Sequence, residues 1–368
     1  MNTFQGRVGL IQRVLPHYRK PFFNAFGKAC TDGLCVFSGD PRPEESIKPV
    51  VELEHAQLTR GKNRHIFGGR FYMAFQLGLM KWIKTCDPDV LIVEANPRYL
   101  STPRAIRWMR NKGRPVIGWG LGSPDITGPF ASLRLQRRKN FIQHFDTLIT
   151  YSQTGASEYA KLGFPKERIF VAANAVTPSP PNPMPDRRAP EEVQRVRILF
   201  VGRLQERKNL DNLIHACSQL PETLQPDLVI VGDGPDRLRL AKIAEKVYPW
   251  TIFTGALYGE DLARQFRQAD LFVLPGTGGL AIQQAMSYGL PVIAAQADGT
   301  QADLIREGNG WQIPADNITA LRSTLEKALV DKAALREMGA ESYRIVSEEI
   351  NIDKMVQVFI EALNRSLS

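Results

Sequence analysis

The sequence of 368 residues has only four cysteines and lacks long apolar runs. No apolar stretch approaches the roughly 18 residues of a membrane-spanning helix, and residues 1–14 contain no apolar segment of the kind found in signal peptides. The cysteines have no metal-ligand spacing and are too few to cross-link a chain of this length, so we expect them to be reduced and mostly buried. These absences predict a cytoplasmic protein, and they are compatible with peripheral contact at the cytoplasmic face of a membrane.

Acidic residues are scarce in the first half of the chain. Residues 1–180 contain 26 Lys and Arg against 13 Asp and Glu, whereas residues 181–368 contain 21 against 25. This asymmetry favours an anionic partner for the first half, such as a phosphorylated ligand, a membrane surface or a nucleic acid. Because no RNA-binding, zinc-finger or helix-turn-helix signature accompanies the charge, we expect no nucleic-acid partner.

Short apolar runs alternate with amphipathic stretches along the whole chain, which predicts an α/β protein with parallel sheets covered by helices. The expected strands are Val8–Val14, Val90–Glu94, 115–119 and 147–151 in the first half, and Arg197–Val201, Asp227–Val231, 250–254, Leu271–Leu274 and 291–295 in the second. The expected helices between the later strands are 210–219 and 236–247. The length and this repeated alternation favour two doubly wound, Rossmann-like domains.

A proline-rich segment at residues 178–190, with six prolines, is the expected domain linker. It divides an N-terminal acceptor-side domain at residues 1–177 from a C-terminal domain at residues 191–350. A final helix at residues 351–368 is expected to pack by its apolar face, with Val356, Phe359, Ile360 and Leu363, and it can return to the first domain. Two such domains would face a cleft, where the strand ends of both place binding groups.

Basic residues and glycines follow the expected strands of the second half. Arg203 and Lys208 come after the strand Arg197–Val201, where two cations can hold a diphosphate. The next strand ends in GDGP, and neither this run nor GWGLGSP in the first half has the third glycine of a dinucleotide fingerprint. Taken singly, these signals more often mark solvated loops and ordinary turns than a binding site.

In chain order, the segments VGRLQERKN, VGDGP, FTG, ADLFVLPG and GLAIQQAMSYGLPVIA resemble the second domain of family 4 glycosyltransferases of the GT-B fold. The resemblance is strong over residues 198–314. VLPHYRKPFF and ANAV are similar to the family's first domain, where the resemblance is weaker.

The resemblance implies a retaining transfer of a sugar from a UDP- or GDP-linked sugar, which is a co-substrate, with no cofactor and no metal. Arg203 and Lys208 match the positions that neutralise the donor diphosphate, and are the expected catalytic residues. The expected donor-binding residues are Gly202, Gly232, Gly255, Gly276, Gly278, Gly279, Leu280 and Gln284. Glycines also let a backbone approach a phosphate closely, so the residue types support this assignment independently.

Two positions depart from the family pattern. The family's E-x7-E motif reads Gly276 and Gln284 here, and the histidine of its WGHG run is replaced by Leu121. Gln284 can still hydrogen-bond a ribose, because its amide both donates and accepts. Gly276 cannot replace a carboxylate, so that role has no carrier at this position.

The acceptor side of the site is expected in the first domain, at His17, Tyr18, Arg19, Glu94, Trp119 and Asp125. For Glu94 and Asp125 a cap or surface role is the alternative. Basic stretches at residues 104–114 and 134–139 are either solvated helix faces or a contact with anionic lipid or a lipid-diphosphate acceptor.

We therefore expect a glycosyltransferase that acts on a glycan or a lipid-linked acceptor in the synthesis of a surface polysaccharide or glycoconjugate. The alternative is a catalytically silent GT-B subunit that binds a glycan or stabilises a partner, which the missing Glu and His favour. A nucleotide-sugar epimerase of the same fold would require cleft carboxylates and histidines that the sequence does not place.

Overall fold

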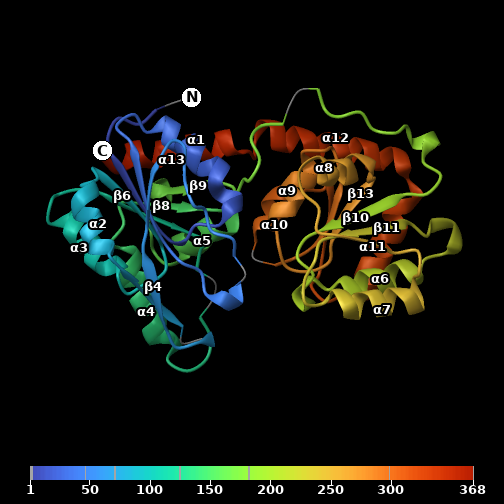
Figure 1. Cartoon of the computed structure of the whole chain (residues 1–368), viewed down its shortest axis with the longest axis horizontal. Helices are drawn as coiled ribbons and strands as arrows, with labels where there is room; N and C mark the ends of the chain where they lie inside the picture. Colours follow the sequence, from blue (N-terminus) through green and yellow to red (C-terminus); the bar gives the residue numbers. More distant parts are fainter. Residues whose placement is uncertain are drawn as a thin grey trace. The chain divides into compact units, whose positions relative to one another are not determined.

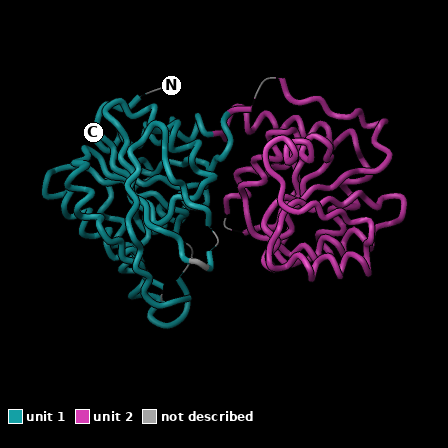
Figure 2. The backbone as a smooth tube through the Cα atoms, in the orientation of Figure 1, with its two compact units in different colours: residues 1–178, 352–368 teal, residues 179–351 magenta. Residues whose placement is uncertain are grey.

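The computed structural model describes residues 3–45, 47–69, 72–123, 126–180, 183–297 and 299–367. The chain divides into two compact units (Figure 2). Unit 1 contains Met1–Pro178 together with Ile352–Ser368, and unit 2 contains Ser179–Asn351. The C-terminal helix therefore belongs to the same unit as the N-terminal residues.

Unit 1 is built on a parallel sheet with the strand order β3-β2-β1-β6-β7-β8-β9. Its strands are β1 (Val8–Val14), β2 (Leu34–Gly39), β3 (Gln57–Arg60), β6 (Val90–Glu94), β7 (Val116–Gly120), β8 (Thr147–Thr150) and β9 (Ile169–Val171). An antiparallel hairpin of β4 (Lys62–Ile66) and β5 (Met73–Leu77) stands apart from this sheet. The helices are α1 (Lys20–Ala29), α2 (Leu79–Cys86), α3 (Thr102–Arg110), α4 (Ala131–Ile142), α5 (Gln153–Lys161) and α13 (Ile352–Leu367).

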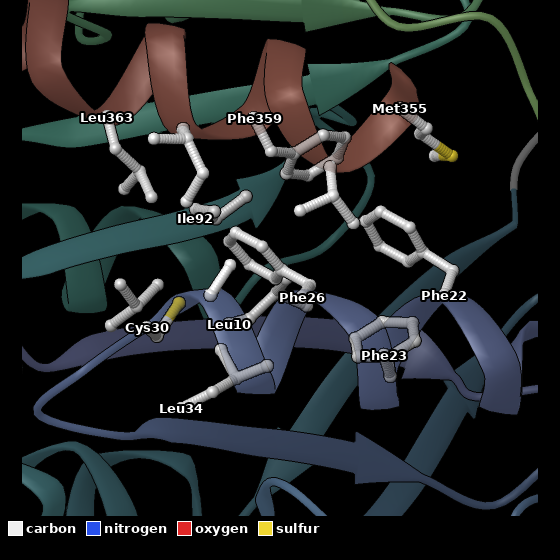
Figure 3. Close-up of a cluster of buried hydrophobic side chains, with 14 of the residues drawn as sticks. Leu10, Phe22, Phe23, Phe26, Cys30, Leu34, Ile92, Met355, Phe359 and Leu363 are labelled. Carbon is white, nitrogen blue, oxygen red and sulfur yellow. The ribbon is translucent and has the colours of Figure 1, made fainter. Parts of the chain in front are cut away.

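Two apolar clusters stabilise unit 1. Successive residues of a strand point to opposite faces of its sheet, and in β1 Leu10 belongs to one cluster while Ile11 belongs to the other. The first cluster lies under α1 and α13, which cover this face together (Figures 1 and 3). The second contains buried residues of α2 and α3. The sheet is thus covered on both faces, as buried parallel strands require.

The expected packing face of the C-terminal helix is confirmed. Val356, Phe359, Ile360 and Leu363 are all fully buried in α13. The ring of Phe359 lies 5.0 Å from Phe22 and 5.3 Å from Phe26 of α1, measured between ring centroids, and these rings meet edge to face (Figure 3). Aromatic pairs favour this edge-to-face geometry, and the ring of Phe359 is therefore a stabilising part of the core of unit 1.

Unit 2 contains a second sheet with the order β12-β11-β10-β13-β14-β15, and its pairings are parallel. Its strands are β10 (Arg197–Val201), β11 (Asp227–Val231), β12 (Ile252–Gly255), β13 (Leu271–Leu274), β14 (Val292–Ala295) and β15 (Gly310–Ile313). Its helices are α6 (Leu210–Ser218), α7 (Arg237–Val247), α8 (Gly259–Gln268), α9 (Leu280–Met286), α10 (Thr300–Leu304), α11 (Ile318–Val330) and α12 (Lys332–Glu348). Figure 1 shows α6 and α7 on one side of the sheet and α8 and α12 on the other.

A buried carboxylate fixes the end of the proline-rich segment to unit 2. Asp270 is 1% exposed and forms ion pairs with Arg188 at 2.8 Å and Arg336 at 2.7 Å. It also accepts a hydrogen bond from the backbone N–H of Arg197, at the start of β10. Arg187 donates to the carbonyl of Phe266. Residues 187 and 188, which the sequence predicts as part of a linker, are therefore anchored to this unit.

The strands predicted for both halves are confirmed, with small shifts at their ends. The largest shift is at β12, which begins at Ile252 rather than at residue 250, because Thr251 donates a backbone hydrogen bond to Tyr248 in a turn. The four cysteines are free and buried, as expected. Among the described residues, no helix has both the length and the apolar character needed to cross a bilayer.

We expect Phe359→Ala to destabilise unit 1 by about 3–5 kcal/mol, because it leaves a cavity among tightly packed rings. Chemical denaturation followed by aromatic fluorescence should show an earlier transition. Asn364→Ala, on the exposed side of the same helix, is the matched control. Equal stability of the two variants would contradict the role given to α13.

Candidate functional site

The strand order of unit 2 brings four glycine-containing segments to one edge of its sheet, and these segments contain Gly202, Gly232, Gly255 and Gly276. The segments follow β10, β11, β12 and β13, which lie side by side, and parallel strands end at the same edge. The connections leave β10 and β13 toward opposite sides, which makes the point between them a topological switch point. Open α/β sheets bind ligands at such points.

Backbone hydrogen bonds join three of these segments. The N–H of Gly202 donates to the carbonyl of Val231 at 3.0 Å, and the N–H of Gly232 donates to the carbonyl of Gly255 at 2.8 Å. Gly232 has a φ of 143°, and a Cβ there would lie 1.9 Å from the carbonyl oxygen of Gly202. Only glycine fits this position, so the GDGP run allows the two loops to touch.

A pocket of about 520 Å³ opens beside these loops. It is lined by Val201, Gly202, Arg203, Val231, Gly232, Asp233, Gly234, Ala256, Leu257, Tyr258 and Leu262. Most of these groups are apolar or backbone, and Tyr258 is 80% exposed. Arg203 is exposed, and none of the described residues forms an ion pair with it. The pocket therefore combines an apolar wall with the cation of Arg203 and the carboxylate of Asp233, which form no ion pair with each other.

Lys208 is the second cation at this edge, and it is buried. It ends the short 3-10 helix η6 (Glu206–Lys208), with 9% of the residue exposed, and its Nζ donates to the carbonyl of Thr277. Burial, reinforced by the positive charge of Arg207, lowers the pKa of Lys208 to about 8. No described carboxylate forms an ion pair with it. An anion beside Nζ would relieve this cost.

The position of Gly276 explains why no acid stands there. A Cβ at Gly276 would lie 2.4 Å from the carbonyl oxygen of Arg207 and 2.6 Å from the Cα of Lys208. The N–H of Thr277 also donates to that carbonyl, at 3.0 Å. The loop after β13 therefore rests directly on the segment that carries Lys208, and a Glu side chain has no room at residue 276 without separating the two segments.

Gln301, which the sequence analysis missed, holds the same loop from the other side. It is 1% exposed in α10, and its Nε2 donates to the carbonyl of Gly278 at 2.7 Å. The carbonyls of Thr277 and Gly278 are thus both held by buried side chains. In a trans peptide the N–H points away from the C=O of the same peptide group. The N–H of Gly278 therefore points away from Lys208, and the N–H of Gly279 points away from Gln301. Nothing in a local motif signals this contact, because residues 278 and 301 are distant in sequence.

Gln284, the other altered motif position, lies in α9 and is half-buried. No described residue hydrogen-bonds its side-chain amide, so both of its polar atoms remain available. The neighbouring Gln283 is fully buried instead and donates to the carbonyl of Ile350 at 2.8 Å. Leu280, the first residue of α9, is also half-buried.

In unit 1, the expected acceptor-side residues that follow β1 and end β6 lie at one edge of the sheet. His17, Tyr18 and Arg19 form the 3-10 helix η1 after β1, and Glu94 is the last residue of the neighbouring β6. His17 and Tyr18 are exposed. Arg19 is half-buried, with its Cζ 5.0 Å from the ring centroid of Trp119. The sheet thus brings these separate segments together.

Glu94 is a half-buried carboxyl at this edge. Its Oε2 accepts a hydrogen bond from the backbone N–H of Arg13. Burial raises the pKa of Glu94 to about 7, against the opposing effects of that N–H and of the charges on Arg13 and Arg19. A carboxyl with such a pKa can change its charge near neutral pH.

The expectation for Trp119 requires a correction. Trp119 is 2% exposed, and its ring packs against Phe22, Phe359 and Tyr151 in the core of unit 1. It therefore supports Arg19 from below rather than presenting its ring to a ligand. Leu121, which replaces the family histidine, is 53% exposed. Asp125 lies outside the described residues.

Comparison with known proteins supports the same interpretation. Residues 186–345 match the family model described as "Glycosyl transferases group 1". Over 157 residues the chain is 38% identical to a GDP-mannose-dependent alpha-mannosyltransferase of Corynebacterium glutamicum, a match covering 41% of this chain and 35% of the relative. Over 174 residues it is 31% identical to sulfoquinovosyl transferase SQD2 of Arabidopsis thaliana, covering 43% and 33%. The matches thus span about a third of the length of these curated relatives.

The similarity to solved structures extends over the whole chain. Anabaena HepE (Alr3699), solved in complex with UDP, has a TM-score of 0.72 at 18% identity, over 99% of this chain and 100% of that chain. At this identity the comparison establishes the fold. Residues 186–345, which lie in unit 2, are therefore similar to the group 1 glycosyl transferases, and the chain has the GT-B fold, as the resemblance to family 4 predicts.

Proposed function

We propose that the protein transfers a sugar from a nucleoside-diphosphate sugar, bound by unit 2, to a glycan or lipid-linked acceptor in the synthesis of a polysaccharide or glycoconjugate. The observation that carries this proposal is the buried Lys208, which has no ion-pair partner among the described carboxylates, beside a glycine loop whose Thr277 and Gly278 carbonyls accept hydrogen bonds from Lys208 and Gln301. A cation and backbone donors together suit a diphosphate. The exposed Arg203 adds a second cation.

The apolar pocket beside Arg203 has room for the nucleoside of the donor. A planar base can pack against apolar groups while hydrogen bonds from loop backbone fix its orientation. Among the proteins compared, the name of one relative specifies GDP-mannose and one structure contains UDP. We therefore propose a UDP- or GDP-linked sugar as co-substrate, with Gln284 hydrogen-bonding the ribose.

The proposed reaction retains the configuration of the transferred sugar and uses no metal. The bond between the sugar and the β-phosphate breaks as the acceptor hydroxyl attacks from the same face, and the departing phosphate oxygen takes the hydroxyl proton. Lys208 and Arg203 stabilise the negative charge that grows on the diphosphate. This scheme needs no acid at Gly276, where the backbone contact leaves no space.

Isothermal titration of the full chain with UDP and with GDP tests this proposal. The expected result is that either nucleotide binds. The protein should also slowly hydrolyse the sugar nucleotide that contains the nucleotide it binds. If neither nucleotide gives binding heat at about 1 mM, the transferase proposal is rejected. A Kd above this concentration would mean a binding free energy weaker than about 4 kcal/mol, which is too little for a donor site. Binding without any turnover across donors would instead favour a silent glycan-binding or partner-stabilising subunit.

We also propose that unit 1 is the part that meets the cytoplasmic face of a membrane. On α4, Leu133 is 50% exposed beside the exposed Arg134 and Arg137, and Phe130 just before the helix is 78% exposed. Exposed apolar groups flanked by cations suit an anionic lipid surface. Co-sedimentation with anionic vesicles should be lost in Phe130→Ser/Leu133→Ser, and no sedimentation of the wild type would contradict the proposal.

We expect Lys208→Ala to weaken nucleoside-diphosphate affinity about tenfold or more, because it removes a charge-assisted contact from a buried site. Isothermal titration measures the change. Lys246→Ala, an equal loss of charge at an exposed position in α7, should leave the affinity unchanged. Equal affinities for the two variants would remove Lys208 from the site.

Gln301→Leu should weaken the same affinity about fivefold, because the Gly278 carbonyl loses its buried donor and the loop loses a contact that holds it in place. Gln312→Leu is the matched control, since Nε2 of Gln312 also donates to a backbone carbonyl, that of Ile305, away from this loop. Melting temperatures and nucleotide titrations of both variants separate the effects. A similar loss of affinity in both would assign Gln301 to stability alone.

A further inference from the structure

Two of the four cysteines line one pocket of unit 1. Cys35 is the second residue of β2, and Cys86 is the last residue of α2. The pocket has a volume of about 450 Å³, and the exposed side chains of Arg7 and Gln57 also line it. It lies where β1, β2 and β3 begin, which is the opposite edge of the sheet from Glu94 at the end of β6. The pair is therefore separate from the expected acceptor side.

The two sulfur atoms meet beside this pocket. Helix α2 packs against β2, and the thiols of Cys35 and Cys86 are hydrogen-bonded to each other. The Sγ of Cys35 also donates to Oε1 of Gln57 in β3 at 3.7 Å, so this sulfur is directed toward the pocket. The two cysteines are only 7% and 5% exposed. The arrangement thus favours a small reagent over a bulky one.

Cys35 is the more acidic of the two thiols. The hydrogen bond with Cys86 and the positive charge of Arg7 lower the pKa of Cys35 to about 7, against the opposing effect of burial. The same hydrogen bond, together with burial, raises the pKa of Cys86. The Arg7 guanidinium donates to the carbonyl of Cys86 at 3.2 Å and forms no ion pair with a described residue. Cys35 therefore carries the thiolate, which is the nucleophilic form, and Cys86 keeps its proton.

The other two cysteines have no such surroundings. Burial raises the pKa of Cys30 to about 12 and also raises the pKa of Cys217. Cys30 belongs to the apolar cluster under α1 and α13, whereas Cys217 is fully buried in α6 of unit 2. Neither residue lines the pocket described above. Buried thiols of this kind are inert, so they serve as internal controls.

We propose that Cys35 and Cys86 are a peroxide-sensitive thiol pair, which is oxidised to an intramolecular disulfide that stabilises unit 1. The Cys35 thiolate attacks one oxygen of hydrogen peroxide, the O–O bond breaks, and the second oxygen leaves as hydroxide and is protonated to water. The Cys86 sulfur then attacks the sulfenic sulfur of Cys35. The S–S bond forms as the S–O bond breaks, and the leaving hydroxide takes the Cys86 proton. Two electrons from the two thiols thus reduce one peroxide to two waters.

The disulfide closes a long loop of unit 1. Between Cys35 and Cys86 lie β3, the β4–β5 hairpin and most of α2. Closing this loop restricts the unfolded chain and so stabilises the folded unit. The inference goes beyond the proposed transferase function and does not depend on it, because the pair lies in unit 1 and the nucleotide is assigned to unit 2.

Oxidation of the full chain with hydrogen peroxide tests the proposal. The thiols that remain are alkylated under denaturing conditions and counted by intact mass, and peptide mapping identifies the linked cysteines. Two of the four thiols should become blocked, in one peptide pair that joins Cys35 to Cys86, and dithiothreitol should restore both. If all four stay free, or if the disulfide contains Cys30 or Cys217, the proposal is overturned.

Cys86→Ser separates the two chemical steps, because it keeps the Cys35 thiol and removes its partner sulfur. Peroxide should then leave a sulfenic acid at Cys35, which dimedone traps. Cys217→Ser is the matched control, and it should form the disulfide as the wild type does. Absence of a dimedone adduct at Cys35 in folded Cys86→Ser would contradict the proposed nucleophile.

Thermal unfolding gives a readout that needs no variant. The oxidised wild type should unfold about 5 °C above the reduced wild type, and dithiothreitol should reverse the shift. Equal melting temperatures in the two states would contradict the stabilising role of the disulfide.

Discussion

The close contact between two backbone segments of unit 2 determines what the loop after β13 can contain. Gly276 lies directly on the backbone of Arg207 and Lys208, at a distance that leaves no room for a side chain. The contact positions the Lys208 ammonium under the loop, where it meets the Thr277 carbonyl. The same packing that excludes an acid at residue 276 therefore places a buried cation beside the loop. The charged group at this position is an ammonium rather than a carboxylate.

The two units repeat one architectural device with opposite chemistry. Each is a doubly wound parallel sheet with a switch point beside its first strand. The switch point lies between β1 and β6 in unit 1, and between β10 and β13 in unit 2. In unit 2 this point carries cations and glycine amides, which suit a diphosphate. In unit 1 it carries a carboxyl, Glu94, and a guanidinium, Arg19. The fold alone does not assign these roles, because the side chains at the strand ends decide them.

Much of this fold could be predicted from the sequence, because buried parallel strands are continuous apolar runs. The bounds expected for β1, β6, β10, β11 and β13 agree with the structure. The β4–β5 hairpin was not anticipated, since charged and half-exposed residues interrupt its strands. The return of the last helix to unit 1 follows from its apolar face only once the sheet that it covers is known.

The site was less predictable, because contacts between distant segments decide it. Family motifs located Arg203, Lys208 and the glycine loop, but spacing could not reveal that Gly276 touches residue 207. Gln301 belongs to no local motif and reaches the loop only through the order of β13 and β14. Trp119 was assigned to the acceptor side, yet alternation along β7 directs its ring into the core.

Measurement of nucleoside-diphosphate release from UDP-glucose and GDP-mannose tests the central claim most directly. The claim is that a buried lysine and a constrained loop, without an acid at residue 276, suffice to activate a sugar nucleotide. Slow, protein-dependent release from one donor, reduced at least tenfold in Lys208→Ala at saturating donor, is the predicted result. Release at the same rate in wild type and variant would contradict it.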